Sequence, residues 1–209
     1  MILSQNIHKS TKHAGRYEEI IINILINYFK LNGYDVVPHS SLNIAWGSII
    51  SDIDILMIKN FQLICIEVKS NRDKIAKAKG QIERIKDYID FAYVASDKPI
   101  DNFELPDVGI IQIQGDEVTI LRMATKFTNK PDLFSLASLK KKCIENIFGD
   151  NKHLNKSSNK YELALNVYLN DKCSRECLKE IVTCGGSCGI SCPILHIAKE
   201  ELLIEKTKF

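Results

Sequence analysis

Residues 51–70, SDIDILMIKNFQLICIEVKS, determine what fold this chain can adopt. Residues 53–58 and 63–68 are two β-branched, almost wholly apolar runs separated by a Lys-Asn turn. Such runs with turn residues between them predict two neighbouring strands of a hairpin. The hairpin therefore belongs to the interior of a sheet, and the rest of the chain is interpreted around it.

Charged residues interrupt both predicted strands. Asp52 and Asp54 begin the first, and Glu67 and Lys69 end the second. Alternation along a strand places Asp52 with Asp54 on one face, and Glu67 with Lys69 on one face. A tight turn then brings Asp54 opposite or diagonal to Glu67, about 5 or 7 Å away between Cβ atoms. A surface ion pair is the alternative interpretation, but charges inside apolar strands are costly unless they are paired or bind a metal.

These residue types suit phosphodiester hydrolysis. Mg²⁺ (or Mn²⁺) prefers carboxylate and water oxygens, which Asp54 and Glu67 would supply. A bound ion lowers the pKa of water and stabilises charge on the scissile phosphate. The neighbouring Lys69 would orient the attacking water or offset that charge.

The flanking sequence predicts an α/β core. Residues 16–31 form an amphipathic pattern ended by Asn32-Gly33, which predicts a helix. An extended segment over 34–37, halted by Pro38, precedes the hairpin, and a helix over 74–89 with a strand over 91–95 follows it. Strand, helix and strand in this order predict a parallel pair with a right-handed crossover. Residues 108–113 and 118–122 predict a second hairpin at the sheet edge.

The second part of the chain has a different pattern. We expect a core over residues 1–125 and a small helical, cysteine-rich extension over residues 126–209. The extension is predicted to contain helices over 133–147, 161–169, 175–182 and 192–204, and a linker over 149–160.

The hairpin and its surroundings resemble the PD-(D/E)XK nuclease superfamily, especially its RecB-like and archaeal Holliday-junction-resolvase members. The resemblance covers residues 16–95. It rests on Asp54, thirteen intervening residues and Glu67-Val68-Lys69, and on the order helix, motif hairpin, helix, strand. It implies a restriction-endonuclease-like core, with a central mixed β-sheet flanked by helices, and metal-dependent cleavage of DNA. Ser51 stands where the family often has proline.

The resemblance also implies roles for residues on two helices. The family often carries an acidic residue in its first helix, where this chain has Glu18 and Glu19; we favour Glu18, one turn before the apolar face. Gln81 and Tyr88 resemble polar residues on the helix after the motif. The predicted site is therefore Glu18, Asp54, Glu67, Lys69 and Gln81, with Asp54, Glu67 and Glu18 as metal ligands and Asp52 as an alternative ligand.

The composition of the chain is compatible with this function but does not by itself indicate it. The formal net charge is +2, with 45% hydrophobic and 26% charged residues, so a DNA-binding patch must be local. Basic residues do gather after the motif: Lys69, Arg72, Lys74, Lys77, Lys79, Arg84 and Lys86. No apolar run reaches membrane-spanning length and no signal peptide begins the chain, so we expect a cytoplasmic protein without a membrane partner.

Seven cysteines are unevenly placed. Cys65 lies in a predicted strand and is expected to act as a small core residue. Five others, Cys173, Cys177, Cys184, Cys188 and Cys192, fall close together. Their spacing leaves Zn²⁺ binding, disulfides and free thiols open.

The sequence thus predicts a Mg²⁺-dependent DNA endonuclease, with branched DNA as the first substrate class and a homodimer expected from the resemblance. The alternative is a non-catalytic DNA-binding protein on a nuclease-like scaffold. Cleavage of RNA is a third reading that the sequence leaves open.

Overall fold

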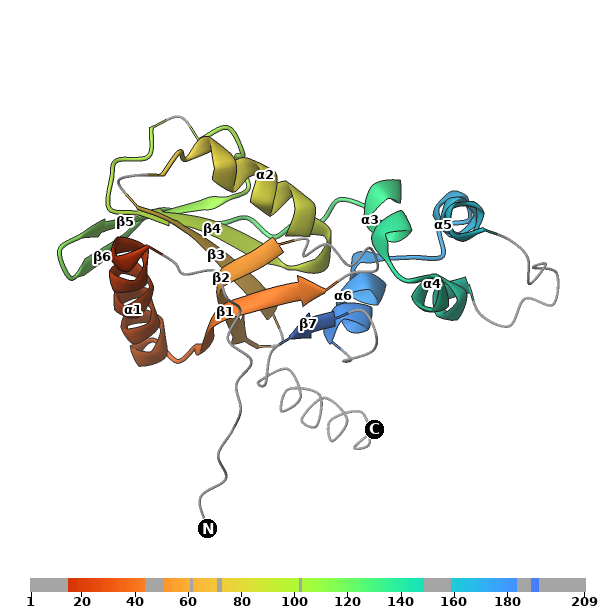
Figure 1. The fold of residues 1–209 in the computed structure, drawn as a ribbon, viewed down its shortest axis with the longest axis horizontal. Coiled ribbons are helices and arrows are strands. Elements are labelled where there is room, and N and C mark those ends of the chain that lie inside the picture. Colours follow the sequence, from red (N-terminus) through yellow and green to blue (C-terminus); the bar gives the residue numbers. More distant parts are fainter. Residues whose placement is uncertain are drawn as a thin grey trace, which may run out of the picture.

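The structure is a computed structural model that describes residues 15–43, 51–60, 62–70, 73–101, 103–148, 159–183 and 189–191. These residues form an α/β fold with one mixed sheet of seven strands, in the order β6-β5-β4-β3-β2-β1-β7, flanked by helices (Figure 1). The elements are α1 (Arg16–Leu31), β1 (Asp35–Asn43), β2 (Ser51–Lys59), β3 (Gln62–Lys69), α2 (Ala76–Ile85), the 3-10 helix η1 (Lys86–Tyr88), β4 (Phe91–Ser96), β5 (Gly109–Gln114), β6 (Glu117–Arg122), α3 (Leu133–Ser138), α4 (Lys141–Phe148), α5 (Lys160–Leu169), α6 (Arg175–Thr183) and β7 (Gly189–Ser191).

The central topology agrees with the sequence prediction. Strands β1, β2 and β3 form an antiparallel meander, and β3 pairs with β4 in parallel after α2. Helix α1 has the predicted bounds, with Asn32 as its C-cap and Gly33 at a φ of +76°. Asn60, in the predicted Lys-Asn turn, adopts a φ of +50° that lets β2 return directly into β3. The predicted edge hairpin is β5 and β6.

The sheet separates two apolar clusters. On one face, Leu25 and Phe29 of α1 pack against Ile55, Ile66 and other buried strand residues. On the opposite face, α2 packs through Ala78, Ile82 and Ile85. The alternation of apolar residues in β3 directs one set of side chains to each helix layer, which makes the core a three-layer arrangement.

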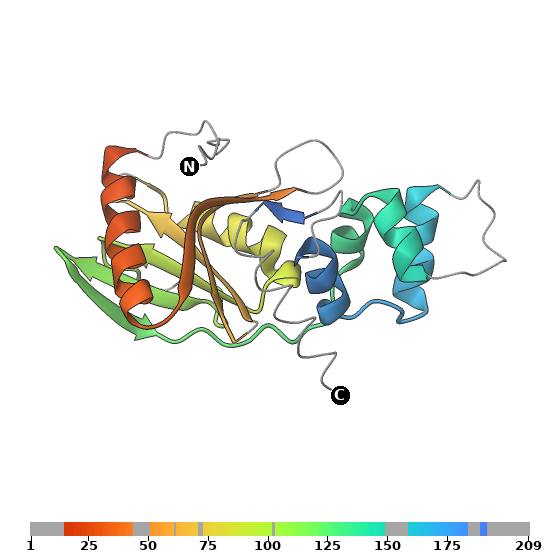
Figure 2. The same ribbon diagram turned by 90° about the horizontal axis from the view of Figure 1, so that it is seen from below.

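Helices α3 to α6 lie to one side of the sheet, away from α1 (Figures 1 and 2). Their buried residues Leu136, Ile144, Val167 and Leu178 belong to the same apolar cluster as α2. The predicted extension therefore packs directly on the core.

Buried ionic contacts fix this junction. Arg175 at the start of α6 contacts Asp87, with 3.3 Å between Nη1 and Oδ1, and donates to the carbonyl of Ile89 at 2.8 Å. Lys179 donates to Asp90, which also accepts from the amide of Leu63 at 2.8 Å. Because Asp87 and Asp90 are almost completely buried, these pairs couple α6 to the chain around η1.

Several sequence predictions were wrong in detail. The helix predicted over 133–147 is two helices, because Leu139 is extended, at a ψ of 158°, and fully buried between α3 and α4. Strand β1 does not stop at Pro38: it continues to Asn43. Pro38 pairs with Ile55 of β2, and the described residues of β7 reach β1 only from Ser41 onward.

Other predictions need adjustment or cannot be compared. The helix predicted over 74–89 begins at Ala76 and ends in η1, and β7 was not predicted. The helix predicted over 192–204 lies outside the described residues. Among the described residues, no helix has both the length and the apolar character needed to cross a membrane.

Candidate active site

Strands β2 and β3 bring the two predicted acidic positions together. Their register pairs Leu56 with Cys65 and Ile55 with Ile66, so Asp54 and Glu67 follow as the next opposing positions. Asp54 reaches across to β3, where its Oδ2 accepts a hydrogen bond from the amide of Val68 at 2.8 Å. The hairpin thus places both carboxylates at the carboxyl end of β3.

Glu67 and Lys69 form a buried ion pair. Only 2% of Glu67 and 6% of Lys69 is exposed, and the Lys69 Nζ contacts Glu67 Oε1. Cys65, on the same side of β3, packs in the α2-side cluster, so Glu67 and Lys69 also face the α2 layer. The interpretation as an exposed surface ion pair is therefore wrong for this pair.

The acidic groups outnumber the positive charge around Lys69. Burial and the nearby charge of Asp54 raise the pKa of Glu67 to about 8, against the pull of Lys69. Burial likewise raises the pKa of Asp54, although its hydrogen bond from Val68 and the charge of Lys69 oppose that rise. Burial alone would lower the pKa of Lys69, but the attraction of Glu67, Asp54 and Glu18 raises it.

The first turn of α1 brings Glu18 to the same cluster. Burial and the charge of Asp54 raise the pKa of Glu18, and Lys69 lowers it slightly. Its carboxylate also accepts from the amide of Gly15 at 3.3 Å, closing the start of the helix. The neighbouring Glu19 is partly exposed, and its Oε1 lies 3.1 Å from Nε2 of His39 on β1.

Strand β2 is irregular at Asp54, which corrects one prediction. Ile53 packs in the α2-side cluster and Ile55 in the α1-side cluster, although strict alternation would place both on one face. The β1–β2 register pairs Pro38 with Ile55 and Ser40 with Ile53, leaving His39 opposite Asp54. Because alternation is interrupted between Ile53 and Ile55, the prediction that Asp52 and Asp54 share one face does not hold; on β1, His39 has a left-handed φ of +52°.

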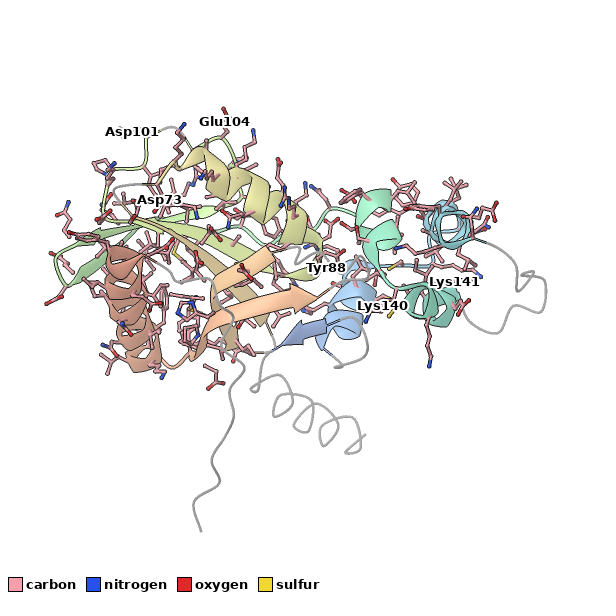
Figure 3. All side chains as sticks on the ribbon, in the orientation of Figure 1. Asp73, Tyr88, Asp101, Glu104, Lys140 and Lys141 are labelled. Carbon is pink, nitrogen blue, oxygen red and sulfur yellow. The ribbon has the colours of Figure 1, made fainter. Side chains whose placement is uncertain are left out.

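Gln81 and Tyr88 do not join this cluster. Gln81 is partly exposed on α2 and makes no hydrogen bond within the described part of the chain. Tyr88 is buried at the junction with the extension, where its hydroxyl donates to the carbonyl of Ser135 at 2.9 Å (Figure 3). The Tyr88 hydroxyl thus joins η1 to α3, and the role that the resemblance implies for Tyr88 stays a prediction.

The basic residues after the motif differ in exposure and in their contacts. Lys74 and Lys77 are exposed, whereas Lys79 pairs with Glu104 on the loop after β4 (Figure 3). Arg72 lies outside the described residues.

Three further polar residues adjoin the cluster and were missed from the sequence: Ser96, Gln112 and, on the loop after β3, Asp73. Ser96 of β4 is aligned with Lys69, and Gln112 of β5 is aligned with Ser96; both are buried. The Gln112 Nε2 donates to the carbonyl of Ser96 at 3.1 Å. Gln112 interrupts an otherwise apolar strand, which is the same signal that identified Glu67.

Asp73 closes the loop that follows Lys69. It accepts from the amide of Ser70 at 3.0 Å and from the Ser70 hydroxyl, and it lies near the N-terminal end of α1 (Figure 3). The Ser70 hydrogen bond lowers the pKa of Asp73, so its carboxylate carries charge beside Glu18 and Lys69. No sequence pattern distinguished Asp73 from an ordinary loop aspartate.

The donor set suits a hard divalent cation, although the side chains do not already surround one point. Asp54 Oδ1 and Glu67 Oε2 make no hydrogen bond to described residues, so each carboxylate keeps one uncommitted oxygen. Among the described residues, no three His, Cys, Asp or Glu side chains form a ready-made metal cluster. Glu67 is engaged by Lys69, and binding of Mg²⁺ would require that contact to loosen.

The cysteine cluster is described only in part. Cys65 is a buried thiol in the core, as predicted. Cys173 precedes α6 and Cys177 lies on it; the hydrogen bond with Cys177 and burial raise the pKa of Cys173. Cys184, Cys188 and Cys192 lie outside the described residues, and Zn²⁺ binding stays a prediction.

Comparison with known proteins gives a family. A family model described as bacteriophage P4 protein cII matches residues 11–183. No curated protein matches the chain. A solved structure, the SPO1766 protein of unknown function from Silicibacter pomeroyi, matches at a TM-score of 0.45 and 17% identity, over 56% of this chain and 77% of that chain. That likeness is too distant to indicate a function.

Proposed function

The chain belongs to the family of bacteriophage P4 protein cII, and we propose that it is a metal-dependent nuclease that hydrolyses phosphodiester bonds in DNA. One observation carries the proposal: three carboxylates, Asp54, Glu67 and Glu18, gather around one buried lysine, Lys69, at the end of β3. A structural ion pair needs one acid for one base. The excess of acid in a partly buried place is the arrangement that a divalent cation would neutralise.

The order of elements supports the same proposal. Helix α1, the hairpin β2–β3, helix α2 and strand β4 follow one another as in PD-(D/E)XK nucleases, with the carboxylates and lysine on the hairpin. The restriction-endonuclease-like core is part of this proposal. The homodimer, inferred from the same resemblance, is part of it too.

The residues divide the chemistry between them. Asp54 and Glu67 would hold Mg²⁺ or Mn²⁺ through their uncommitted oxygens, with Glu18 supporting the site from α1. The bound ion supplies Lewis-acid stabilisation of the phosphate and a more acidic water. Lys69, released from Glu67, orients the attacking water or donates to a phosphate oxygen as negative charge develops there. Gln81 would contact the substrate only if its side chain moved toward the site when DNA binds.

A cleavage experiment tests this proposal. Labelled four-way-junction DNA, the matched linear duplex and a matched RNA duplex are incubated with the full chain in Mg²⁺ or Mn²⁺, with EDTA as control. The variants are Asp54→Asn, Glu67→Gln and Lys69→Met. Glu104→Gln is the matched control, because Glu104 is an exposed partner of Lys79 outside the cluster. We expect metal-dependent cutting of DNA that falls at least about a hundredfold in each site variant and stays unchanged in the control.

The outcomes separate the alternatives. Cutting of the junction in preference to the duplex assigns a branched-DNA substrate. Cutting that survives Glu67→Gln contradicts the proposed site. DNA binding without cutting, indifferent to metal and to the site variants, would instead assign the non-catalytic DNA-binding function.

A further inference from the structure

His39 occupies an unusual position beside the candidate site. It lies opposite Asp54 in the β1–β2 ladder, between the paired residues Pro38 and Ser40. Its φ of +52° is in the left-handed region, which a side chain with a Cβ enters at a cost in free energy. The strained residue is therefore adjacent to a proposed metal ligand rather than in an ordinary turn.

One edge of the His39 ring is already held. Nε2 lies 3.1 Å from Oε1 of Glu19, which follows Glu18 in the first turn of α1. This contact joins α1 to β1. Within the described residues, the second ring nitrogen, Nδ1, has no hydrogen-bond partner, and 40% of the side chain is exposed.

The charges around His39 indicate what the open edge of its ring could bind. When ionised, the carboxylates of the cluster repel a DNA phosphate, and Lys69 lies on the β3 side of Asp54. His39 approaches Asp54 from the β1 side, where it lowers the pKa of that carboxyl. A substrate phosphate lying across Asp54 would thus meet a hydrogen-bond donor on each side.

We propose that His39 is a substrate-contacting residue: held by Glu19 at Nε2, it donates from Nδ1 to a phosphate oxygen of the DNA strand bound over Asp54 and Glu67. The inference rests on the proposed nuclease function and deepens it, because it assigns the β1 side of the site to the substrate backbone.

Two variants separate substrate contact from a structural role. His39→Asn removes the imidazole but tolerates the left-handed backbone, and His39→Ala removes the donor without that tolerance. The full chain is assayed for cleavage in Mn²⁺ and for DNA binding in Ca²⁺, with Glu104→Gln as control. For His39→Asn we expect KM and Kd for DNA to rise about tenfold, with kcat within about threefold of wild type and an unchanged melting temperature.

Chemically altered DNA makes the test specific. A series of duplexes each carries one neutral methylphosphonate linkage near the cleavage position. Wild type should lose about tenfold in binding at one linkage where His39→Asn loses nothing further, since the lost contact is the same.

The outcomes distinguish this inference from the function on which it rests. Wild-type cleavage together with wild-type KM and Kd in His39→Asn overturns the role of His39 and leaves the nuclease intact. A parallel fall of kcat and melting temperature, with KM unchanged, also overturns it and assigns a structural role. Failure of wild type to cut any DNA overturns the nuclease and the inference together.

Discussion

Folding stability of the metal-free protein should fall as the pH rises from about 5 to about 8. Burial and the charge of Asp54 raise the pKa of Glu67 to about 8, so in this window the folded chain keeps a proton that the unfolded chain has released. Asp54 and Glu18 also have raised pKa values, and they act in the same direction. The stability from Glu67 is complete below pH 4.5 and is lost as the pH rises through its folded pKa of about 8.

The magnitude follows from the difference in pKa. One pKa unit corresponds to about 1.4 kcal/mol, so a rise from the ordinary value of 4.5 to about 8 corresponds to roughly 5 kcal/mol for Glu67. Because Lys69 remains beside the ionised carboxylate, we expect a measured loss of ~2–5 kcal/mol between pH 5 and pH 8.5.

Urea denaturation in EDTA, followed by circular dichroism at half-unit steps of pH, measures this loss. Glu67→Gln should flatten the profile, because its neutral amide has no proton to release. Glu104→Gln is the control, since Glu104 is exposed and pairs with Lys79 away from the cluster. A wild-type free energy of unfolding that stays level or rises over this range, or a Glu67→Gln profile as steep as wild type, would refute the reasoning.

Three further predictions concern packing, the junction and metal binding. A Cβ at Gly109 would overlap the Tyr93 ring, so Gly109→Ala should destabilise the fold by ~1–3 kcal/mol, whereas Gly80→Ala, with open space on α2, should stabilise it by ~0.5–1 kcal/mol in urea denaturation. Arg175→Ala leaves the buried Asp87 without its cation and should cost ~3–5 kcal/mol, with faster proteolysis of the extension as a second readout. Mn²⁺ at a hundred times its Kd should raise wild-type stability by ~2.7 kcal/mol, measured by calorimetric melting, and should leave a variant without the site carboxylates unchanged.

Local sequence signals were sufficient for the central fold. The apolar run of β3 and the Asn32-Gly33 end of α1 are determined by neighbouring residues, and both lie where the sequence predicts. The convergence of Asp54 and Glu67 was also predictable, because a tight turn and a period of two leave few possible registers.

The remaining features depend on contacts between distant segments. From the sequence Pro38 looks like the end of a strand, and only its pairing with Ile55 of β2 shows that β1 continues past it. Leu139 fits a continuous helix by periodicity, but its burial between α3 and α4 favours a break. The predicted strand ended before Pro38 and so did not include His39. The approach of His39 to Asp54 could therefore not be predicted.

The second cluster of buried charge shows the same limit. No sequence signal marked Asp87 and Asp90, because their partners Arg175 and Lys179 lie almost ninety residues later. Leu63 and Lys69 mark the two ends of β3, about 20 Å apart. The structural ion pairs and the candidate site therefore occupy opposite ends of one strand.

The most direct test of the central claim is the rate of DNA cleavage in Mn²⁺ by wild type and Glu67→Gln, measured side by side with excess protein over labelled junction and duplex DNA. We expect wild type to cut DNA and EDTA to abolish the cutting. For Glu67→Gln we expect a cleavage rate at least about a hundredfold lower, with equal folding of both proteins. Equal rates for the two proteins, or no cutting by wild type on either DNA, would contradict it.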